Sequence, residues 1–188
     1  MLNLENIGPS EIYLPSYLFD KTHRYLDLLK KKYNKYEDIS LYLVRDNVEM
    51  DDEKIDIVVI IRFYRNWVQT LVPIVPVDEI SSEKKVEFYE LILSLNNELA
   101  DTSFELDKDL GLIMISNETH IDSYVFDVFE EEYNAILNAL SEFFKRAKKI
   151  IPNITEIARK GMQKWLNKHS SYICGFDSES LYKLDQTP

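Results

Sequence analysis

The hydrophobic pattern is sharpest over residues 86–144, where the spacing of apolar positions changes from helical to alternating and back to helical. The first part predicts an amphipathic helix with one apolar stripe. That stripe consists of Val86, Tyr89, Ile92, Leu93 and Leu99. Alternation at Phe104 and Leu106, followed by a turn at Gly111 and an apolar run from Leu112, predicts a β-hairpin. Its second strand is apolar on both faces, so we expect it to be central or covered by helices.

Two further helices are predicted after this hairpin. The first is long and opens at Asp122 or Ser123, with a continuous apolar side. The residues of that side are Phe126, Phe129, Tyr133, Leu137, Leu140 and Phe144. The long helix stops before Pro152, and the second helix runs from Ile154 to about Lys168.

The N-terminal half predicts one helix and three strands. Apolar residues recur at helical spacing from Ser16 to near Asn34. Strands are predicted at Ile39–Arg45, Ile55–Tyr64 and Val68–Val75. A longer acidic turn separates the first two, and the middle of the second is apolar on both faces, so it must be covered on both sides. Pro73 and Pro76 confine the end of the third strand to an edge or to its exit from the sheet.

The predicted order of elements is α-β-β-β-α-β-β-α followed by a C-terminal helix, which defines an α+β fold. A chain of 188 residues is long enough for one well-packed core. We therefore expect an irregular lead over residues 1–15, a single α+β domain over residues 16–151, and a C-terminal helix and tail over residues 152–188.

The composition narrows the possible partners and location. There are 22 Lys and Arg against 33 Asp and Glu, a net charge of −11, which repels nucleic acid and attracts basic partners. The single cysteine, Cys174, excludes an intramolecular disulfide and fits a reducing cytoplasm. No segment approaches the roughly 20 consecutive apolar residues that a membrane-spanning helix needs. We expect a cytoplasmic protein that neither binds nucleic acid nor inserts into a membrane.

One acidic turn superficially resembles a calcium loop. Asp107, Asp109 and Glu118 have the spacing of first, third and twelfth ligands. The sixth position of such a loop requires glycine, and here it is Leu112; the flanking elements are strands instead of helices. We therefore interpret the segment as a hairpin turn and expect no metal.

A second feature is a carboxylate–histidine cluster in an extended segment. It consists of Glu118, His120 and Asp122, alternate residues that would point to one side. Catalysis needs convergence with other groups, and no nucleophile motif or nearby second histidine supplies it. Asp122 is better explained as a helix cap. Phosphate-binding loops, nucleophile elbows and dinucleotide fingerprints are also absent from the sequence, so we expect no catalytic residue and no cofactor.

Two isolated polar residues have structural explanations. His23 falls among charged residues on the polar side of the first helix and is interpreted as a solvated surface histidine. Asn96 places an amide beside the apolar stripe at the end of the second helix. We expect its side chain to bond to neighbouring backbone, as asparagine commonly does near helix ends.

Four segments carry a resemblance to a known family. They are the helix end Leu91–Asn96, the strand Phe104–Asp107 with its turn to Gly111, the strand Leu112–Ile115 and the helix Phe126–Ala147. Together with the element order, they resemble the type III secretion chaperone-like superfamily, including the bacterial YbjN-like proteins, over residues 16–151. The resemblance implies a sandwich of helices on a twisted antiparallel sheet of about five strands. It also implies a homodimer that binds segments of another protein without chemistry.

Three functions are consistent with this sequence. The first is a non-enzymatic protein-binding module, chaperone-like or adaptor, that binds apolar segments of a partner protein. The alternative is a small-ligand-binding protein or enzyme that uses a pocket between the sheet and the long helix, where Arg62, Glu118 and His120 would converge. The third is a structural subunit of a larger assembly.

Overall fold

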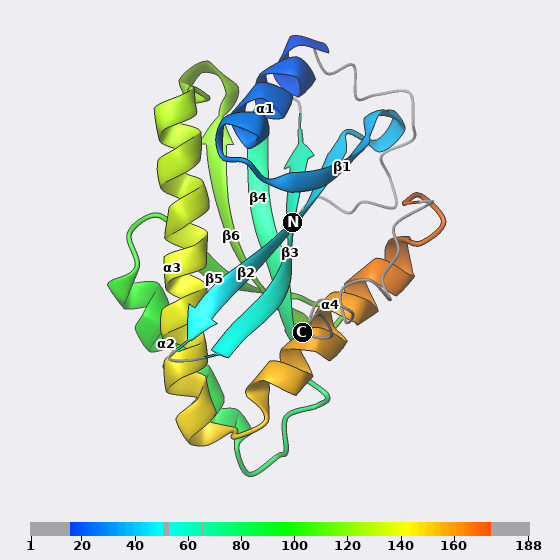
Figure 1. Cartoon of the computed structure of the whole chain (residues 1–188). Coiled ribbons are helices and arrows are strands. Elements are labelled where there is room, and N and C mark those ends of the chain that lie inside the picture. The colour runs from blue at the N-terminus through cyan, green and yellow to red at the C-terminus, as the bar shows by residue number, and fades with distance from the viewer. Residues whose placement is uncertain (1–15, 51–52, 65, 174–188) are drawn as a thin grey trace, which may run out of the picture.

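The computed structural model describes residues 16–50, 53–64 and 66–173. The lead expected over residues 1–15 and most of the expected tail, including Cys174, lie outside them. The described chain is α+β, as predicted: an antiparallel sheet in the order β1-β2-β3-β4-β6-β5 carries four α-helices (Figure 1). The helices are α1 (Ser16–Leu28), α2 (Lys85–Glu98), α3 (Phe126–Ile150) and α4 (Ile154–His169). The strands are β1 (Lys32–Tyr36), β2 (Leu41–Met50), β3 (Glu53–Phe63), β4 (Trp67–Pro76), β5 (Ser103–Asp107) and β6 (Leu112–His120).

The sequence prediction missed the edge strand β1, so the sheet has six strands instead of five. The first helix ends at Leu28 and not near Asn34. Lys30 adopts a left-handed conformation (φ 54°), and the N–H of Lys31 donates to the carbonyl of Leu26, which closes the helix in the manner of a Schellman motif. Glycine usually marks this position, so a lysine there gave no signal in the sequence.

Strands β2 and β3 form a longer hairpin than predicted. The expected acidic turn is largely strand, because β2 continues to Met50 and β3 begins at Glu53. Val48 and Met50 are buried, whereas Glu49 between them is exposed and pairs across the hairpin with Lys54. The acidic side chains that suggested a loop therefore include the outward positions of an ordinary alternating strand.

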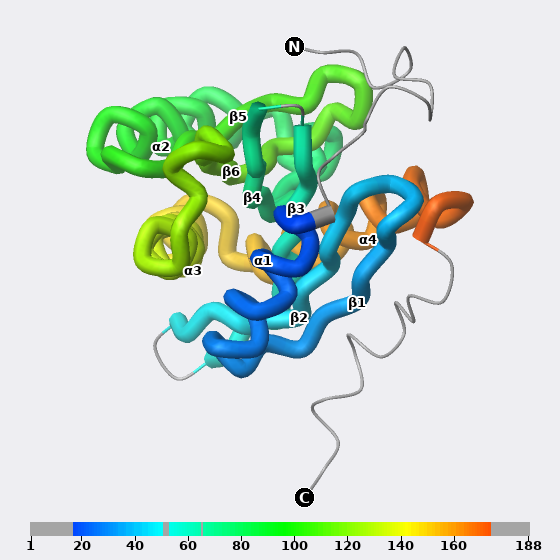
Figure 2. The backbone as a smooth tube through the Cα atoms, turned by 90° about the horizontal axis from the view of Figure 1, so that it is seen from above, coloured from blue at the N-terminus to red at the C-terminus, as the bar shows by residue number. Residues whose placement is uncertain are grey.

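Helices cover the two faces of the sheet, and α3 and α4 lie on opposite sides of it (Figure 2). On the α3 side, the ring of Phe19 in α1 lies 5.2 Å from that of Tyr42. Tyr133 of α3 donates a hydrogen bond to Asp46 on the same strand. Val58 and Val59 of β3 point to opposite faces and both are buried. The prediction that this strand is covered on both sides is confirmed.

Helix α4 approaches the sheet where β4 leaves β3. These strands pair only from Val68 to Leu71, so Pro73 and Pro76 lie where β4 is an open edge on its β3 side and pairs with β6 alone, as the sequence predicted for the end of this strand. At Gly161, a Cβ atom would lie 2.0 Å from the carbonyl oxygen of Ile74. Only glycine therefore permits this close contact between helix and strand.

The long helix α3 begins later than predicted. It starts at Phe126, and residues 121–123 form a single 3-10 turn in which Asp122 is exposed. Asp122 does not cap α3: Val125 occupies the N-cap position, and the backbone N–H of Asp122 donates to Nδ1 of His120. The buried side of α3 is largely aromatic, with Phe129 and Tyr133 among its fully buried residues.

Candidate functional site

Helix α2 has two apolar stripes, and the structure buries the one that was not predicted. The buried residues are Phe88, Leu91, Ile92 and Leu95. Of the predicted stripe, Ile92 is buried and Leu99 is partly buried against the core. Val86 is 67% exposed, Leu93 68% and Tyr89 37%. These three, at positions i, i+3 and i+7, lie on one side of the helix, and we call them the exposed α2 stripe.

The buried stripe fastens α2 to α3 and the sheet. The ring of Phe88 lies 6.1 Å from that of Phe143 in α3, which in turn lies 5.4 Å from that of Phe104 in β5. Leu106 lies two residues further along β5, which is an edge strand, and is partly exposed. The exposed α2 stripe is therefore carried by a helix with a well-packed inner face.

Asn96 joins the end of α2 to the outer edge of β5. Its side-chain Nδ2 donates to the carbonyl of Phe104 at 3.0 Å, and its Oδ1 accepts from the N–H of Phe104 at 2.7 Å. The carboxamide thus supplies the two hydrogen bonds that a neighbouring strand residue would make. The prediction that Asn96 bonds to nearby backbone is confirmed.

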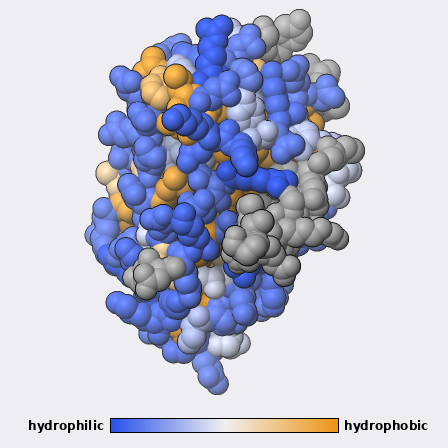
Figure 3. Space-filling model, viewed as in Figure 1, coloured by the Kyte–Doolittle hydropathy of each residue, from blue (hydrophilic) through white to orange (hydrophobic). Residues whose placement is uncertain are grey.

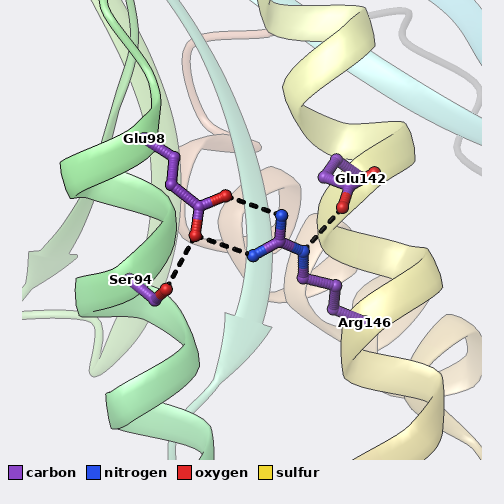
Figure 4. Close-up of polar contacts among 4 residues, drawn as sticks. All are labelled: Ser94, Glu98, Glu142 and Arg146. Atoms are coloured by element: carbon purple, nitrogen blue, oxygen red, sulfur yellow. Dashed lines mark hydrogen bonds and ion pairs between the residues drawn. The ribbon is translucent and has the colours of Figure 1, made fainter.

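An ion-pair cluster joins α2 to α3 on the solvent side (Figure 4). Arg146 donates to both carboxylate oxygens of Glu98, at 2.9 and 2.6 Å, and to Glu142 at 2.6 Å. Ser94 donates a further bond to Glu98. Hydrogen bonds from Arg146 are the main reason that the pKa of Glu98 falls to about 2. This bidentate contact fixes the geometry of α2 relative to α3.

Two of the three predicted pocket candidates are connected, through a residue that was not predicted. Arg62 Nε donates to Oε1 of Gln69 at 2.5 Å, and Gln69 Nε2 donates to Oε1 of Glu118 at 2.9 Å. His120 lies apart, edge-on to Trp67 with 5.1 Å between the ring centroids. Gln69 was recognisable only from the register, which places it between Arg62 and Glu118 on neighbouring strands.

These candidates lie on the sheet face away from α3. Thr119, between Glu118 and His120 in β6, donates to Glu132 of α3, so its two neighbours point to the other face. The layer between the sheet and α3 is filled by buried aromatic side chains such as Phe143. Arg62, Glu118 and His120 therefore do not line a space beneath the long helix.

Other polar groups are used in local structure. Tyr33 contacts His23 and donates to Asp27, and burial is the largest of the effects that raise the pKa of Tyr33 to about 12, so its hydroxyl is protonated at neutral pH. His23 itself is half-exposed, in agreement with its interpretation as a surface residue. In the acidic hairpin turn, Asp107 Oδ1 accepts from two backbone N–H groups, those of Asp109 and Leu110.

A surface groove of about 520 Å³ lies between α4 and the segment after β4. Four of its charged lining residues are already paired, Asp78 with Lys164 at 3.3 Å and Glu79 with Lys160 at 2.7 Å. Within the described residues there is no group of three or more His, Cys, Asp or Glu side chains that could hold a metal ion. None of the described helices is both long enough and apolar enough to cross a membrane.

Figure 3 shows that the side of the molecule seen in Figure 1 is mostly hydrophilic, with hydrophobic surface concentrated at the upper left, over the start of α3. Val125, the N-cap residue of α3, is half-exposed. By contrast, the exposed α2 stripe repeats at helical spacing over two turns, which makes it the more extensive candidate for a contact surface.

Comparison with solved structures finds the same fold elsewhere. The chain is similar to YbjN from E. coli, with a TM-score of 0.50 and 12% identity over 70% of this chain and 91% of that one. It is also similar to the ExsC–ExsE complex (TM-score 0.49, 14% identity, 71% and 94% covered). A third similarity is to the HopA1–SchA chaperone–effector complex (TM-score 0.46, 16% identity, 70% and 96% covered). The similarity to YbjN confirms the predicted YbjN-like resemblance for the fold. No protein-family model matches the chain, and no curated protein matches it.

Proposed function

We propose that this chain is a non-enzymatic protein-binding module, chaperone-like or adaptor, that binds an apolar segment of a partner protein on the exposed α2 stripe. The observation that carries the proposal is the exposure of Val86 and Leu93, about two-thirds each, on a helix whose other side is fixed. Burying an exposed Val or Leu side chain is worth about 1.5–3 kcal/mol. That free energy becomes available when a partner covers the stripe.

The environment of the polar candidates supports a role in binding over one in catalysis. Gln69 lies between Arg62 and Glu118 and hydrogen-bonds to both, so its carboxamide separates the guanidinium from the carboxylate. His120 is half-exposed against Trp67, and its Nδ1 accepts a backbone N–H. In the part of the chain that the structure describes, these groups are held in structural contacts instead of facing a common space.

Affinity capture with mass spectrometry tests this proposal. The tagged full chain and its V86Q/L93Q variant are used as baits in extracts of the source organism. The control is L28Q/Y172Q, which changes two residues of similar exposure, 62% and 64%, outside α2. We expect one partner to be recovered with the wild type and the control and lost with V86Q/L93Q. Recovery of the same proteins by all three baits, with all three folded by circular dichroism, would contradict the proposal.

We also propose that the protein is a cytoplasmic homodimer. The family resemblance of the sequence supports the homodimer. The cytoplasmic location is supported by the single cysteine, because a reducing compartment does not favour disulfides. The net charge of −11 is consistent with a protein partner and opposes binding to nucleic acid.

A further inference from the structure

We infer that the partner segment bound by the exposed α2 stripe is amphipathic and basic, with its cations along one flank. This inference rests on the proposed function and adds the chemistry of the partner to it. It follows from the distribution of acidic residues around the stripe. Glu83, in the turn that leads into α2, precedes Val86 by three positions, and Glu90 follows it by four. Both carboxylates therefore border the same side of the apolar stripe.

These two carboxylates are free to meet a partner's cations. Glu83 and Glu90 are exposed, and neither forms an ion pair with any residue of the described chain. The other acidic residues of α2 differ: Glu87 pairs with Lys84 at 3.2 Å, and Glu98 is held by Arg146. The carboxylates left without an ion pair in α2 and the turn before it are thus the two that lie next to Val86 and Leu93.

The opposite flank of the stripe has a different character. It contains Lys85 and Asn96, and the Asn96 side chain is turned to the backbone of β5. The acidic border is therefore one-sided. A segment that places apolar side chains on Val86 and Leu93 would gain from cations on the Glu83 and Glu90 side only. The net charge of −11 adds a long-range attraction that speeds association with a basic segment.

A pair of synthetic peptides tests the inference directly. Both are amphipathic helical peptides with leucines at i, i+3, i+4 and i+7; one carries lysines along one flank, and the other carries glutamates at the same positions. Binding to the full chain is measured by fluorescence anisotropy at about 0.05 M and 0.15 M salt. We expect the lysine peptide to bind about tenfold or more tightly than the glutamate peptide. This preference should decrease at the higher salt concentration.

Three variants locate the effect on the protein. In E83K/E90K, the preference between the two peptides should disappear or reverse. In L93Q, binding of the lysine peptide should weaken at least about fivefold, because the apolar contact is lost. The control E130K/E131K makes the same change in net charge on α3 and should keep the wild-type preference within about threefold. This control separates the proposed surface from general attraction to an acidic protein.

The outcomes distinguish this inference from the proposed function. Equal binding of both peptides, still dependent on Leu93, would overturn the basic segment and leave the apolar binding surface standing. Failure of both peptides to bind, while affinity capture still finds a partner dependent on Leu93, would also overturn it. If light scattering shows that V86Q/L93Q divides a dimer into monomers, a second copy occupies the stripe, and both the inference and the proposed partner site are wrong.

Discussion

At the scale of single residues, side chains form hydrogen bonds with backbone N–H and C=O groups that secondary structure leaves unpaired. Asn96 does so at the edge strand β5, where its carboxamide bonds both polar groups of Phe104. An edge strand otherwise presents free N–H and C=O groups on which another chain can pair. The identity of Asn96 suggested a backbone contact, but its partner, eight residues away on a strand, depends on how α2 folds back on the sheet.

We predict that N96A destabilises the protein by about 1–2 kcal/mol, because two partly buried hydrogen bonds are lost and Phe104 is left unpaired. Equilibrium unfolding in urea measures this free energy. N97A is the matched control: its side chain is exposed, and its free energy of unfolding should stay within about 0.5 kcal/mol of the wild type. Equal losses in the two variants would show that the Asn96 bonds contribute no specific stability.

At the scale of elements, α2 shows why an apolar pattern is not sufficient to place a helix. Its sequence contains two stripes at helical spacing, one through Val86 and Leu93 and another through Phe88 and Leu95. Both satisfy the same periodicity, and only packing against α3 and β5 selects the second. Of the predicted stripe, Ile92 and Leu99 pack against the core, whereas Val86, Tyr89 and Leu93 face solvent and form the candidate contact surface.

The contact between α2 and α3 should be sensitive to acid through Glu98. Its pKa in the folded protein is about 2, below the ordinary value of 4.5. Because folding lowers this pKa, the stability that the Glu98 carboxylate contributes is present above about pH 4.5 and is lost as the pH falls towards 2. We therefore predict that the difference in unfolding free energy between the wild type and R146Q shrinks between pH 5 and pH 2.

Urea unfolding at several pH values measures this difference. The control is K149Q, which removes an exposed cation in the last turn of α3 and should keep a constant difference from the wild type over this range. The pH-dependent part should also decrease with added salt, because the Glu98 and Arg146 side chains are partly exposed. A wild-type and R146Q difference that does not change with pH would contradict the lowered pKa.

Close approach of α4 to β4 gives a second prediction at this scale. In G161A the new methyl group would lie 2.0 Å from the carbonyl oxygen of Ile74, so the helix must move away from the strand. We expect a loss of about 1–3 kcal/mol in unfolding free energy. Alanine favours a free helix over glycine by about 1 kcal/mol, so a stabilised G161A would show that the contact is loose. The exposed K168A in the same helix serves as control and should change the stability by less than about 0.5 kcal/mol.

At the scale of the whole molecule, the sheet separates two layers of helices. The α3 side holds α1 and α2 and carries the exposed α2 stripe, whereas the other side is covered by α4 along β4. The sheet residues Arg62, Gln69 and Glu118 lie on the α4 side. A partner bound on α2, as proposed, would therefore not contact the polar residues that the sequence suggested as a pocket.

We predict that the purified protein is a homodimer, with a molar mass by light scattering of twice the chain mass of 22.2 kDa. Since the exposed α2 stripe is assigned to a partner protein, V86Q/L93Q should keep the dimer mass. A single-chain mass at micromolar concentrations would show that the homodimer implied by the family resemblance does not apply to this chain.

The sequence by itself determined the α+β class and the kind of most elements, because these depend on local periodicity and turn residues. The strands around Val58 and Ile115 were placed well for this reason. Tertiary structure decided the features that depend on contacts between distant segments. These include the start of β1 after a left-handed Lys30, the link from Arg62 to Glu118 through Gln69, and which stripe of α2 faces solvent. The candidate binding surface belongs to this second group, because exposure results from packing and is not a property of a helical repeat.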